Sequence, residues 1–557
     1  MILLILLLVL LVPMSALAVP PEILVINTLD DVHCSGIGIY ESTSPLCITS
    51  EAPMVTPSMD AMAAAGTRLN NMRVGRSCAL SRTMMIGAGS VGRSTNLHGT
   101  NGLAWGAPNT IEIDPYADNL VRRANALGYT TAFFGKSHMG KDNFSEPEFV
   151  IGQSKTFLAE LGFDYAEAVI RAQPGSLDRL SNTMTAAQQR CLGHNSWVSS
   201  DLAGNLVWET GYTSDVISDA VKAYINGITP GEKHVIFVSW SAPHQPSDYA
   251  QGTAECGGAI GQAPAAGTAY AQDDRPPGDI TSFGFKAVYR AGHEYVDARI
   301  GEINALLDLS DAGDDMSLVW GDNGVYMNGA FVECFASDRV KGTGFPCGTN
   351  VPFIVQGGDV ARGEENDGLF HTPDIPKTIG RLLGGNGGGI RDGMSFADCM
   401  TGTGGQNNAT CLDHPVTHYT FWRPNGGQIS NPGNIQRAPR TDDVEVEWVE
   451  WERFAYSTRF NGNWTLRRRY LPGSPSVDGL ITFYEEFYET TLTDPYLASS
   501  NPPRASTQFS GIGKLELTDF TAITANEQSA FLMMQAELDS MDLRDGRIEP
   551  NFSGVTY

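Results

Sequence analysis

The sequence predicts an α/β protein with a large, mostly parallel β-sheet flanked by helices, followed by a smaller C-terminal α+β subdomain that contains an antiparallel sheet. Between residues 22 and 383, short apolar segments typical of buried strands alternate with helix-like segments. Glycine-rich stretches at 384–389 and 401–405 interrupt this alternation. From about residue 415, strand-like segments rich in aromatic residues, Thr and Arg follow one another. We therefore expect a domain over residues 19–415 and a subdomain over 416–557.

Each element of the large domain is predicted from local signals. Proline is favoured in the first turn of a helix and glycine at its end, so Thr56-Pro57 and Asp114-Pro115 are expected to open helices that end at Gly66 and Gly128. Apolar runs bounded by turn residues predict the strands. The expected strands are 22–26, 129–134, 235–240, 317–320 and 351–355, and the other expected helices are 213–225, 285–309 and 374–383.

The C-terminal subdomain is expected to contain antiparallel strands at 444–451, 454–459, 464–470 and 480–487. At the other end of the chain, residues 1–18 read as a signal peptide, because an apolar run too short to span a bilayer precedes the cleavage-type triplet Ala16-Leu17-Ala18. An uncleaved anchor is the alternative. No later segment is long and apolar enough for stable membrane insertion, so the protein is expected to be secreted or to reside in the lumen of a secretory or lysosomal-type compartment.

Nine cysteines fit such a compartment and leave one cysteine without a partner. Cys78 is the best candidate for the unpaired cysteine, because it precedes a predicted helix start and has Arg82 four residues further on. Among the other eight cysteines, close spacing favours three local disulfides and leaves two cysteines for a fourth, although eight cysteines allow 105 connectivities. The expected pairs are Cys34/Cys47, Cys334/Cys347, Cys399/Cys411 and Cys191/Cys256. The sequence also contains N-glycosylation sequons at Asn143, Asn408, Asn463 and Asn551.

The formal net charge of −26 excludes nucleic acid as a partner, because the phosphate backbone would be repelled. An anionic substrate would need a local cluster of basic side chains.

Four predicted strands end in polar residues, and the carboxyl ends of parallel strands meet at one edge of a sheet, where ligands bind. Asp30 and Asp31 follow one strand, and Asp322 and Asn323 follow another. Three carboxylates and an amide suit a hard divalent cation such as Ca²⁺ or Mg²⁺, whereas a set without Cys or His disfavours Zn²⁺. A turn or a helix cap is the alternative explanation for each pair alone.

Basic residues at the same strand ends could hold a tetrahedral anion. Lys136 and His138 follow one strand, His244 follows another, and Arg82 and Lys341 lie elsewhere in the chain. Cys78 precedes a short predicted helix, 81–86, whose N-terminal N–H groups would favour an anionic nucleophile such as a thiolate. A buried structural cysteine is the alternative.

In combination, these motifs resemble the sulfatase family of the alkaline-phosphatase-like superfamily, over residues of about 22 to 385. The blocks occur in the order of the family and read Asp-Asp, Cys-x-x-Ser-Arg, Gly-Tyr-Thr-Thr…Gly-Lys-x-His-x-Gly, Pro-His-x-Pro, Asp-Asn-Gly and Lys-Gly-Thr…Val-Pro. Each block is weak alone, and their order is specific. Further similarities are Leu161-Gly162-Phe163-Asp164, and His371 with Asp374.

The resemblance implies a hydrolase of sulfate monoesters that uses one divalent cation, Ca²⁺ in preference to Mg²⁺. Cys78 would be oxidised by a formylglycine-generating enzyme to an aldehyde, whose hydrate attacks sulfur. The other implied roles are as follows: Asp30, Asp31, Asp322 and Asn323 bind the metal, Arg82 and Lys136 stabilise the hydrated aldehyde, His138 is the base of the release step, and His244 and Lys341 contact the sulfate and assist the leaving group.

One position departs from the family pattern, because Leu80 stands where the family has Pro or Ala. If Leu80 prevents conversion, Cys78 stays a thiol. Two alternatives therefore remain beside a sulfatase: a phosphodiesterase or phosphonate hydrolase on the same scaffold, and a non-catalytic protein that binds sulfated glycans. The sequence does not select among aryl sulfates, sulfated polysaccharides and sulfated steroids as substrates.

Overall fold

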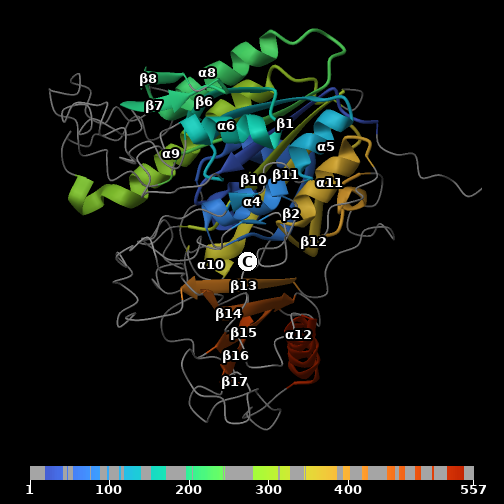
Figure 1. The fold of residues 1–557 in the computed structure, drawn as a ribbon. Helices are drawn as coiled ribbons and strands as arrows, with labels where there is room; N and C mark the ends of the chain where they lie inside the picture. Colours follow the sequence, from blue (N-terminus) through green and yellow to red (C-terminus); the bar gives the residue numbers. More distant parts are fainter. Residues whose placement is uncertain are drawn as a thin grey trace, which may run out of the picture.

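Two β-sheets organise the computed structural model of the chain (Figure 1). The larger sheet has ten strands and the C-terminal sheet has five. The structure describes residues 19–41, 47, 54–75, 77–87, 97–98, 112–113, 118–139, 152–170, 196–203, 205–242, 244, 280–310, 314–325, 341, 344, 346–385, 393–401, 417–424, 448–457, 463–470, 483–490, 505–506 and 524–544.

The larger sheet has the strand order β12-β2-β11-β10-β1-β9-β5-β6-β7-β8. Its pairings make eight of the ten strands run in one direction, with β11 and β7 opposed, which confirms the predicted mostly parallel sheet. The strands are β1 Ile23–Leu29, β2 Gly66–Arg73, β5 Thr130–Lys136, β6 Tyr165–Ile170, β7 Ser196–Ser200, β8 Leu206–Thr210, β9 His234–Ser239, β10 Asp315–Gly321, β11 Asn350–Gly357 and β12 Glu364–His371. Strands β3 Leu97–His98 and β4 Glu112–Ile113 form a separate pair.

Helices cover both faces of this sheet because successive strand side chains point to opposite sides. Val25 packs in one apolar cluster with residues of α3, α8 and α9, whereas its neighbours Leu24 and Ile26 pack in a second cluster with residues of α4, α5, α6 and α11. The helices are α2 Gly38–Glu41, α3 Pro57–Ala64, α4 Cys78–Gly87, α5 Leu120–Ala126, α6 Gly152–Leu161, α8 Thr213–Asn226, α9 Ile280–Asn304, α10 Pro346–Thr349 and α11 Asp374–Leu382.

Several boundaries differ from those expected. Helix α4 begins at Cys78 rather than at residue 81, so the cysteine lies inside the first turn. Helix α5 begins at Leu120, because the Asn119 side chain caps it by accepting a hydrogen bond from Arg122 N at 3.0 Å. The predicted start at 114–115 lies outside the described residues. Gly66, which was expected to end a helix, is the first residue of β2. Helix α9 ends at Asn304, five residues before the predicted end.

The C-terminal sheet is antiparallel, as predicted, with the order β13-β14-β15-β16-β17. It lies below the α/β body in Figure 1, and α12 packs on it through the Phe487 and Phe531 rings, whose centroids are 5.5 Å apart. The prediction of two strands, at 444–451 and 454–459, is wrong, because a single strand, β14, covers Trp448–Ser457. The other elements are β13 Thr417–Pro424, β15 Asn463–Tyr470, β16 Phe483–Thr490, β17 Ala505–Ser506 and α12 Ala525–Arg544.

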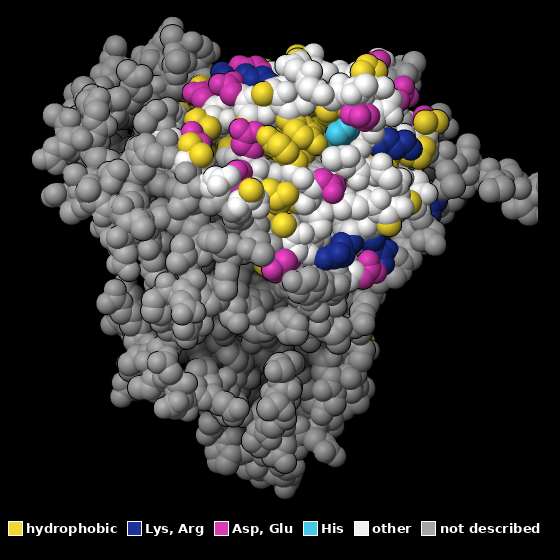
Figure 2. Space-filling model, turned by 45° about the horizontal axis from the view of Figure 1, so that its top comes forward, with side chains coloured by type: hydrophobic (Ala, Val, Ile, Leu, Met, Phe, Trp, Pro, Cys, Tyr) yellow, Lys and Arg dark blue, Asp and Glu magenta, His cyan; other side chains and the backbone are white. Residues whose placement is uncertain are grey.

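Among the described residues, none of the helices combines the length and the apolar character needed to cross a membrane. On the face drawn in Figure 2, Lys and Arg side chains are interspersed with Asp and Glu over the described surface. The predicted signal peptide and the sequons at Asn143, Asn408 and Asn551 lie outside the described residues, whereas Asn463 begins β15.

Candidate active site

The predicted metal ligands lie at the carboxyl ends of the central parallel strands. Strand β1 lies between β10 and β9, and all three run in the same direction. Asp30 and Asp31 directly follow β1, and Asp322 directly follows β10. The ends are joined by a hydrogen bond from Asp322 N to Leu29 O at 3.0 Å. The strand topology therefore brings residues 292 positions apart into contact, as Asn323 and Asp31 show.

Arg82 and Lys136 neutralise two buried carboxylates of the site. Lys136 Nζ forms an ion pair with Asp30 Oδ2, and Arg82 Nε donates to Asp322 Oδ2 at 2.7 Å. Arg82 also donates to the Lys136 carbonyl oxygen at 2.7 Å and to the Ser239 hydroxyl. Through these bonds α4 is fastened to the ends of β5, β9 and β10.

Asp31 has a backbone φ of 60°, in the left-handed region that non-glycine residues rarely adopt. Its Oδ1 accepts hydrogen bonds from Asn323 Nδ2, at 2.7 Å, and from Lys341 Nζ. Its backbone N–H donates to Asp322 Oδ1 at 3.3 Å, and its Oδ2 lies 3.9 Å from His244 Nε2. The carboxylate thus links residues from four separate parts of the chain.

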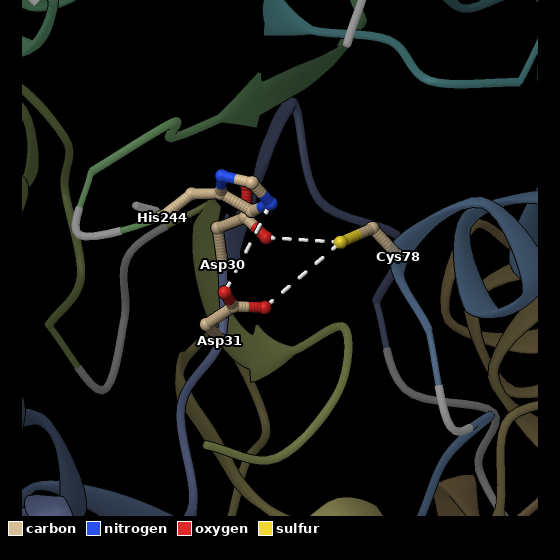
Figure 3. A group of neighbouring side chains, drawn as sticks. All are labelled: Asp30, Asp31, Cys78 and His244. Atoms are coloured by element: carbon tan, nitrogen blue, oxygen red, sulfur yellow. Dashed lines mark hydrogen bonds and ion pairs between the residues drawn. The ribbon is translucent and has the colours of Figure 1, made fainter. Parts of the chain in front are cut away.

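The Cys78 thiol points from α4 toward the carboxylates of Asp30 and Asp31 (Figure 3). Its Sγ is 3.3 Å from Asp30 Oδ1 and 3.9 Å from Asp31 Oδ1. The Nζ atoms of Lys136 and Lys341 lie 3.5 Å and 3.0 Å from the sulfur. Within the described part of the chain Cys78 is the free cysteine, and its side chain is buried.

The surroundings favour the thiol over the thiolate, which is the opposite of what the helix N-terminus alone predicts. Burial raises the pKa of Cys78 well above its usual range, and the carboxylates of Asp30 and Asp322 act in the same direction. Lys136 and Lys341 oppose this increase but do not overcome it. An unmodified Cys78 is therefore protonated at neutral pH and is a weak nucleophile.

The carboxylates differ in how their charge is compensated. Burial alone would raise the pKa of Asp30, but Lys136, His244 and Arg82 outweigh it and hold that pKa well below the usual range. Burial raises the pKa of Asp322 to about 6, and the nearby Asp30 acts in the same direction. Arg82 and Lys136 lower this pKa but do not outweigh burial, so the charge of Asp322 is compensated less fully than that of Asp30.

Both candidate histidines are neutral at physiological pH. Burial, together with Lys136 and Lys341, lowers the pKa of His244 to about 4. Burial, Lys136 and Arg82 likewise hold the pKa of His138 well below its usual range. His138 has a φ of 45°, and its Nδ1 is buried with no hydrogen-bond partner among the described residues.

Two buried oxygens without hydrogen bonds support a cation at this position. Among the described residues, Asp31 Oδ2 and Asn323 Oδ1 have no hydrogen-bond partner, and both residues are almost fully buried. Buried oxygens are normally satisfied, and three carboxylates with an amide are ligands suited to Ca²⁺ or Mg²⁺. The residues present therefore fit a hard divalent cation.

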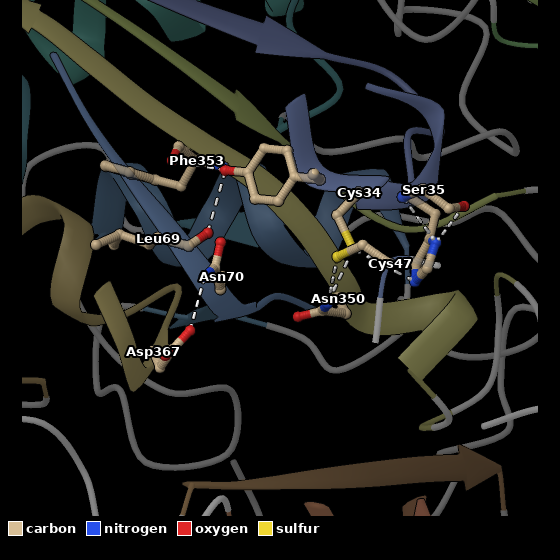
Figure 4. The surroundings of a disulfide bond; sticks show 10 residues. Cys34, Ser35, Cys47, Leu69, Asn70, Asn350, Phe353 and Asp367 are labelled. Atoms are coloured by element: carbon tan, nitrogen blue, oxygen red, sulfur yellow. Dashed lines mark hydrogen bonds between the residues drawn. A yellow bond between two sulfur atoms is a disulfide. The ribbon is translucent and has the colours of Figure 1, made fainter. Parts of the chain in front are cut away.

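A disulfide cross-links the segment that follows the two aspartates, and contacts of Asn350 and Tyr40 attach this segment to β11 (Figure 4). Cys34 and Cys47 form the predicted disulfide, and Asn350 Nδ2 lies 3.0 Å from Cys34 Sγ. Tyr40 OH contacts Phe353 O and N, at 2.9 Å each. Cys347 and Cys399 are also disulfide-bonded, but their expected partners Cys334 and Cys411, and the pair Cys191/Cys256, lie outside the described residues.

Sequence reasoning missed Tyr289, on α9, which donates a hydrogen bond to the Asp31 carbonyl oxygen at 2.6 Å. It also missed Ser239, which bonds to Arg82. An aromatic residue in an amphipathic helix reads as a core residue, and nothing in the sequence distinguishes Tyr289 from one.

Comparisons with known proteins agree with this fold. A family model described as Sulfatase matches residues 29–385, which is more than half of the chain. The chain therefore belongs to the sulfatase family of enzymes. No curated protein matches the sequence.

Solved structures share the fold at low sequence identity. A Bacteroides thetaiotaomicron 4S-sulf protein, studied for the metabolism of multiple glycosaminoglycans, has 16% identity and a TM-score of 0.62, with 95% of this chain and 99% of that chain covered. A protein solved with its substrate D-glucosamine-2-N,6-O-disulfate has 13% identity, a TM-score of 0.55 and coverages of 95% and 99%. A phosphonate monoester hydrolase of Silicibacter pomeroyi has 12% identity, a TM-score of 0.52 and coverages of 94% and 95%.

Proposed function

We propose that this protein hydrolyses sulfate monoesters and that residue 78, as formylglycine, provides the nucleophile. The position of Cys78 is the observation that carries this proposal. Its Sγ lies between the carboxylate of Asp30, at 3.3 Å, and the ammonium group of Lys341, at 3.0 Å. A nucleophile there faces both the anionic ligands of a cation and the basic groups that an anionic ester needs. As a protonated thiol Cys78 is poorly reactive, which favours a modified side chain.

The basic residues stabilise the charge on the reacting sulfate and on the nucleophile. Arg82 and Lys136 hold the group at position 78, and His244 and Lys341 contact the sulfate and assist departure of the alcohol. His138 is neutral, and so it accepts a proton in the release step.

Asp30, Asp31, Asp322 and Asn323 hold one divalent cation, Ca²⁺ in preference to Mg²⁺. When bound, this cation supplies Lewis-acid stabilisation of the anionic substrate, and formylglycine supplies a hydrated aldehyde as the nucleophile. Asn323 and Lys341 orient Asp31 through its Oδ1, while Lys136 orients Asp30 through its Oδ2.

The proposed substrate class is a sulfated glycan, with aryl sulfates as simpler substrates. Support comes from the related structures associated with glycosaminoglycans and with a disulfated glucosamine. We also propose secretion after removal of residues 1–18, a catalytic domain over 19–415, a subdomain over 416–557, and maturation by a formylglycine-generating enzyme that accepts Leu80.

A phosphonate or phosphodiester hydrolase is the second candidate, because one related structure is a phosphonate monoester hydrolase and both ester types present tetrahedral anions. The test compares kcat/KM for matched aryl sulfate and aryl phosphonate monoesters and for a phosphodiester, using the converted protein. Faster turnover of the phosphorus esters would contradict the proposal.

Variants of residue 78 complete this test. Cys78→Ala should abolish sulfate hydrolysis, whereas Ser310→Ala, at an exposed turn, should retain it. Hydrolysis that survives Cys78→Ala would exclude the nucleophile role. A wild-type protein that binds sulfated glycans without hydrolysing them would instead be a binding protein.

A further inference from the structure

The cluster around Asp30 and Asp31 contains sulfur and nitrogen donors as well as oxygens (Figure 3). One ligand atom from each of Asp30, Asp31, Cys78 and His244 lies within 4.8 Å of the others. Cys78 Sγ is 3.3 Å from Asp30 Oδ1, and His244 Nε2 is 3.9 Å from Asp31 Oδ2. Adjacent ligands of tetrahedral zinc lie roughly 3.3 to 3.7 Å apart, given Zn–S of about 2.3 Å and Zn–N and Zn–O of about 2.0 to 2.1 Å.

We propose that the chain with an unmodified Cys78 binds one Zn²⁺ through Cys78 Sγ, His244 Nε2 and one oxygen each of Asp30 and Asp31. A thiolate, an imidazole and two carboxylates form a mixed set that zinc accepts, whereas Ca²⁺ takes oxygen ligands. This site belongs to the form of the chain that precedes formylglycine, and so the inference goes beyond the proposed sulfatase reaction.

The hydrogen bonds around the cluster leave one oxygen of each carboxylate directed to this site. Lys136 engages Asp30 Oδ2, and Asp30 Oδ1 receives the Cys78 thiol. Lys341 and Asn323 engage Asp31 Oδ1, and Asp31 Oδ2 is buried without a hydrogen-bond partner among the described residues. The two lysines therefore orient the carboxylates through Asp30 Oδ2 and Asp31 Oδ1 and leave Asp30 Oδ1 and Asp31 Oδ2 for a metal ion.

Zinc binding replaces the thiol proton of Cys78 with the metal ion and requires no oxidant. The S–H bond of Cys78 breaks, the Zn–S bond forms, and the proton leaves to solvent. His244 binds through the lone pair of Nε2 and carries its proton on Nδ1. The ammonium groups of Lys136 and Lys341, 3.5 Å and 3.0 Å from the sulfur, remain as hydrogen-bond donors to the thiolate.

Conversion of residue 78 to formylglycine changes the ligand set of the pocket. Formylglycine has no sulfur, and so conversion of Cys78 removes the softest ligand and leaves a set richer in oxygen. The metal preference of one pocket therefore changes from Zn²⁺ to Ca²⁺ when residue 78 is oxidised.

The test uses the full chain with intact disulfides, produced so that peptide mass spectrometry finds residue 78 as cysteine. The protein is freed of metal and titrated with Zn²⁺ against a chromophoric chelator. One equivalent should bind, and Cys78→Ser and His244→Ala should each weaken Zn²⁺ binding by about 100-fold or more. His234→Ala is the matched control, because His234 lies at the start of β9, at the opposite end of the strand from His244. This variant should keep the wild-type affinity for Zn²⁺.

A second measurement needs no variant. X-ray absorption at the zinc edge should show one sulfur at about 2.3 Å together with nitrogen and oxygen ligands at about 2.0 to 2.1 Å. A first shell without sulfur, or equal Zn²⁺ affinity in the wild type and in Cys78→Ser, would overturn the inference. Sulfatase activity is measured on the converted chain, and so the two proposals fail independently.

Discussion

Asp31 shows how a single residue couples the backbone to the chemistry of the site. Its left-handed φ of 60° is costly for a residue with a side chain and persists only where neighbours hold it. The neighbours include Tyr289, whose hydroxyl donates to the Asp31 carbonyl oxygen at 2.6 Å. We therefore assign Tyr289 a positioning role toward the proposed cation.

Removal of the Tyr289 hydroxyl should loosen Asp31 and weaken metal binding. Tyr289→Phe is expected to reduce Ca²⁺ affinity roughly 5- to 10-fold. This reduction corresponds to the net contribution of about one hydrogen bond to the free energy of binding. Tyr295→Phe is the matched control on the same helix, because its hydroxyl donates to Asp215 instead. Isothermal titration calorimetry should find weaker Ca²⁺ binding in Tyr289→Phe alone, and equal affinities in the two variants would exclude the role.

Arg82 should be important for stability as well as for the site. Its guanidinium is buried beside Asp322, and Arg82→Ala leaves that carboxylate unpaired, at a cost of about 3 to 5 kcal/mol in the free energy of unfolding. Arg123→Ala, which breaks an ion pair with the exposed Asp118, should cost about 0 to 1 kcal/mol. Urea unfolding of both variants measures the difference, and similar losses would contradict this account.

At the scale of elements, a carboxylate from α9 caps the N-terminus of α3. Asp297 accepts hydrogen bonds from Ser58 N at 3.0 Å and from Met59 N at 2.8 Å, and it is almost fully buried. Burial raises the pKa of Asp297 to about 6, against these two hydrogen bonds, which lower it. The contact of α3 with α9 is therefore sensitive to pH.

The folded state binds the Asp297 proton more tightly than the unfolded state does, and so this residue makes stability fall as pH rises from about 3.8 to about 6. The resulting loss in the free energy of unfolding is roughly 2 to 3 kcal/mol over that pH range. Asp297→Asn, which cannot ionise, should remove this dependence. Urea unfolding at several pH values gives the difference between wild type and variant, and a difference that does not change with pH would refute the assignment.

Helices and strands with a regularly spaced apolar pattern could be predicted from the sequence. A strand whose buried residues are polar was missed. Strand β2, GTRLNNMR, is buried throughout, and it was not predicted because its polar side chains find partners on β12. Arg68 pairs with Glu365, and Asn70 donates to Asp367 at 2.7 Å. The two C-terminal strands merged into β14 because Glu452 and Arg453, which separated them in the sequence pattern, continue the pairing with β15.

At the scale of the whole molecule, the site depends on chain segments that are far apart in sequence. The short motifs pointed to charged residues that the structure brings together, because strand ends of a parallel sheet meet at one edge. They were not sufficient to find Tyr289 or Ser239, whose roles arise only from the packing of α9 and β9 around that edge. Nor could they show that burial keeps the Cys78 thiol protonated.

Metal binding should stabilise the entire fold, because the unfolded chain cannot assemble the ligands. Ca²⁺ at 100 times its dissociation constant should raise the free energy of unfolding by about 2.7 kcal/mol. Asp31→Ala should abolish this increase, whereas Asp308→Ala, at an exposed turn, should retain it. Thermal unfolding with Ca²⁺ and with a chelator checks the prediction, and identical curves for the wild type would count against a cation site.

The central claim is that residue 78 acts as formylglycine, and peptide mass spectrometry across Ser77 to Arg82 tests it most directly. The protein is taken from its native host, and its sulfatase activity is measured on the same sample. The account predicts an aldehyde in place of the Cys78 thiol, in a fraction of molecules that rises and falls with the activity. Active protein that carries only the unmodified thiol would contradict it.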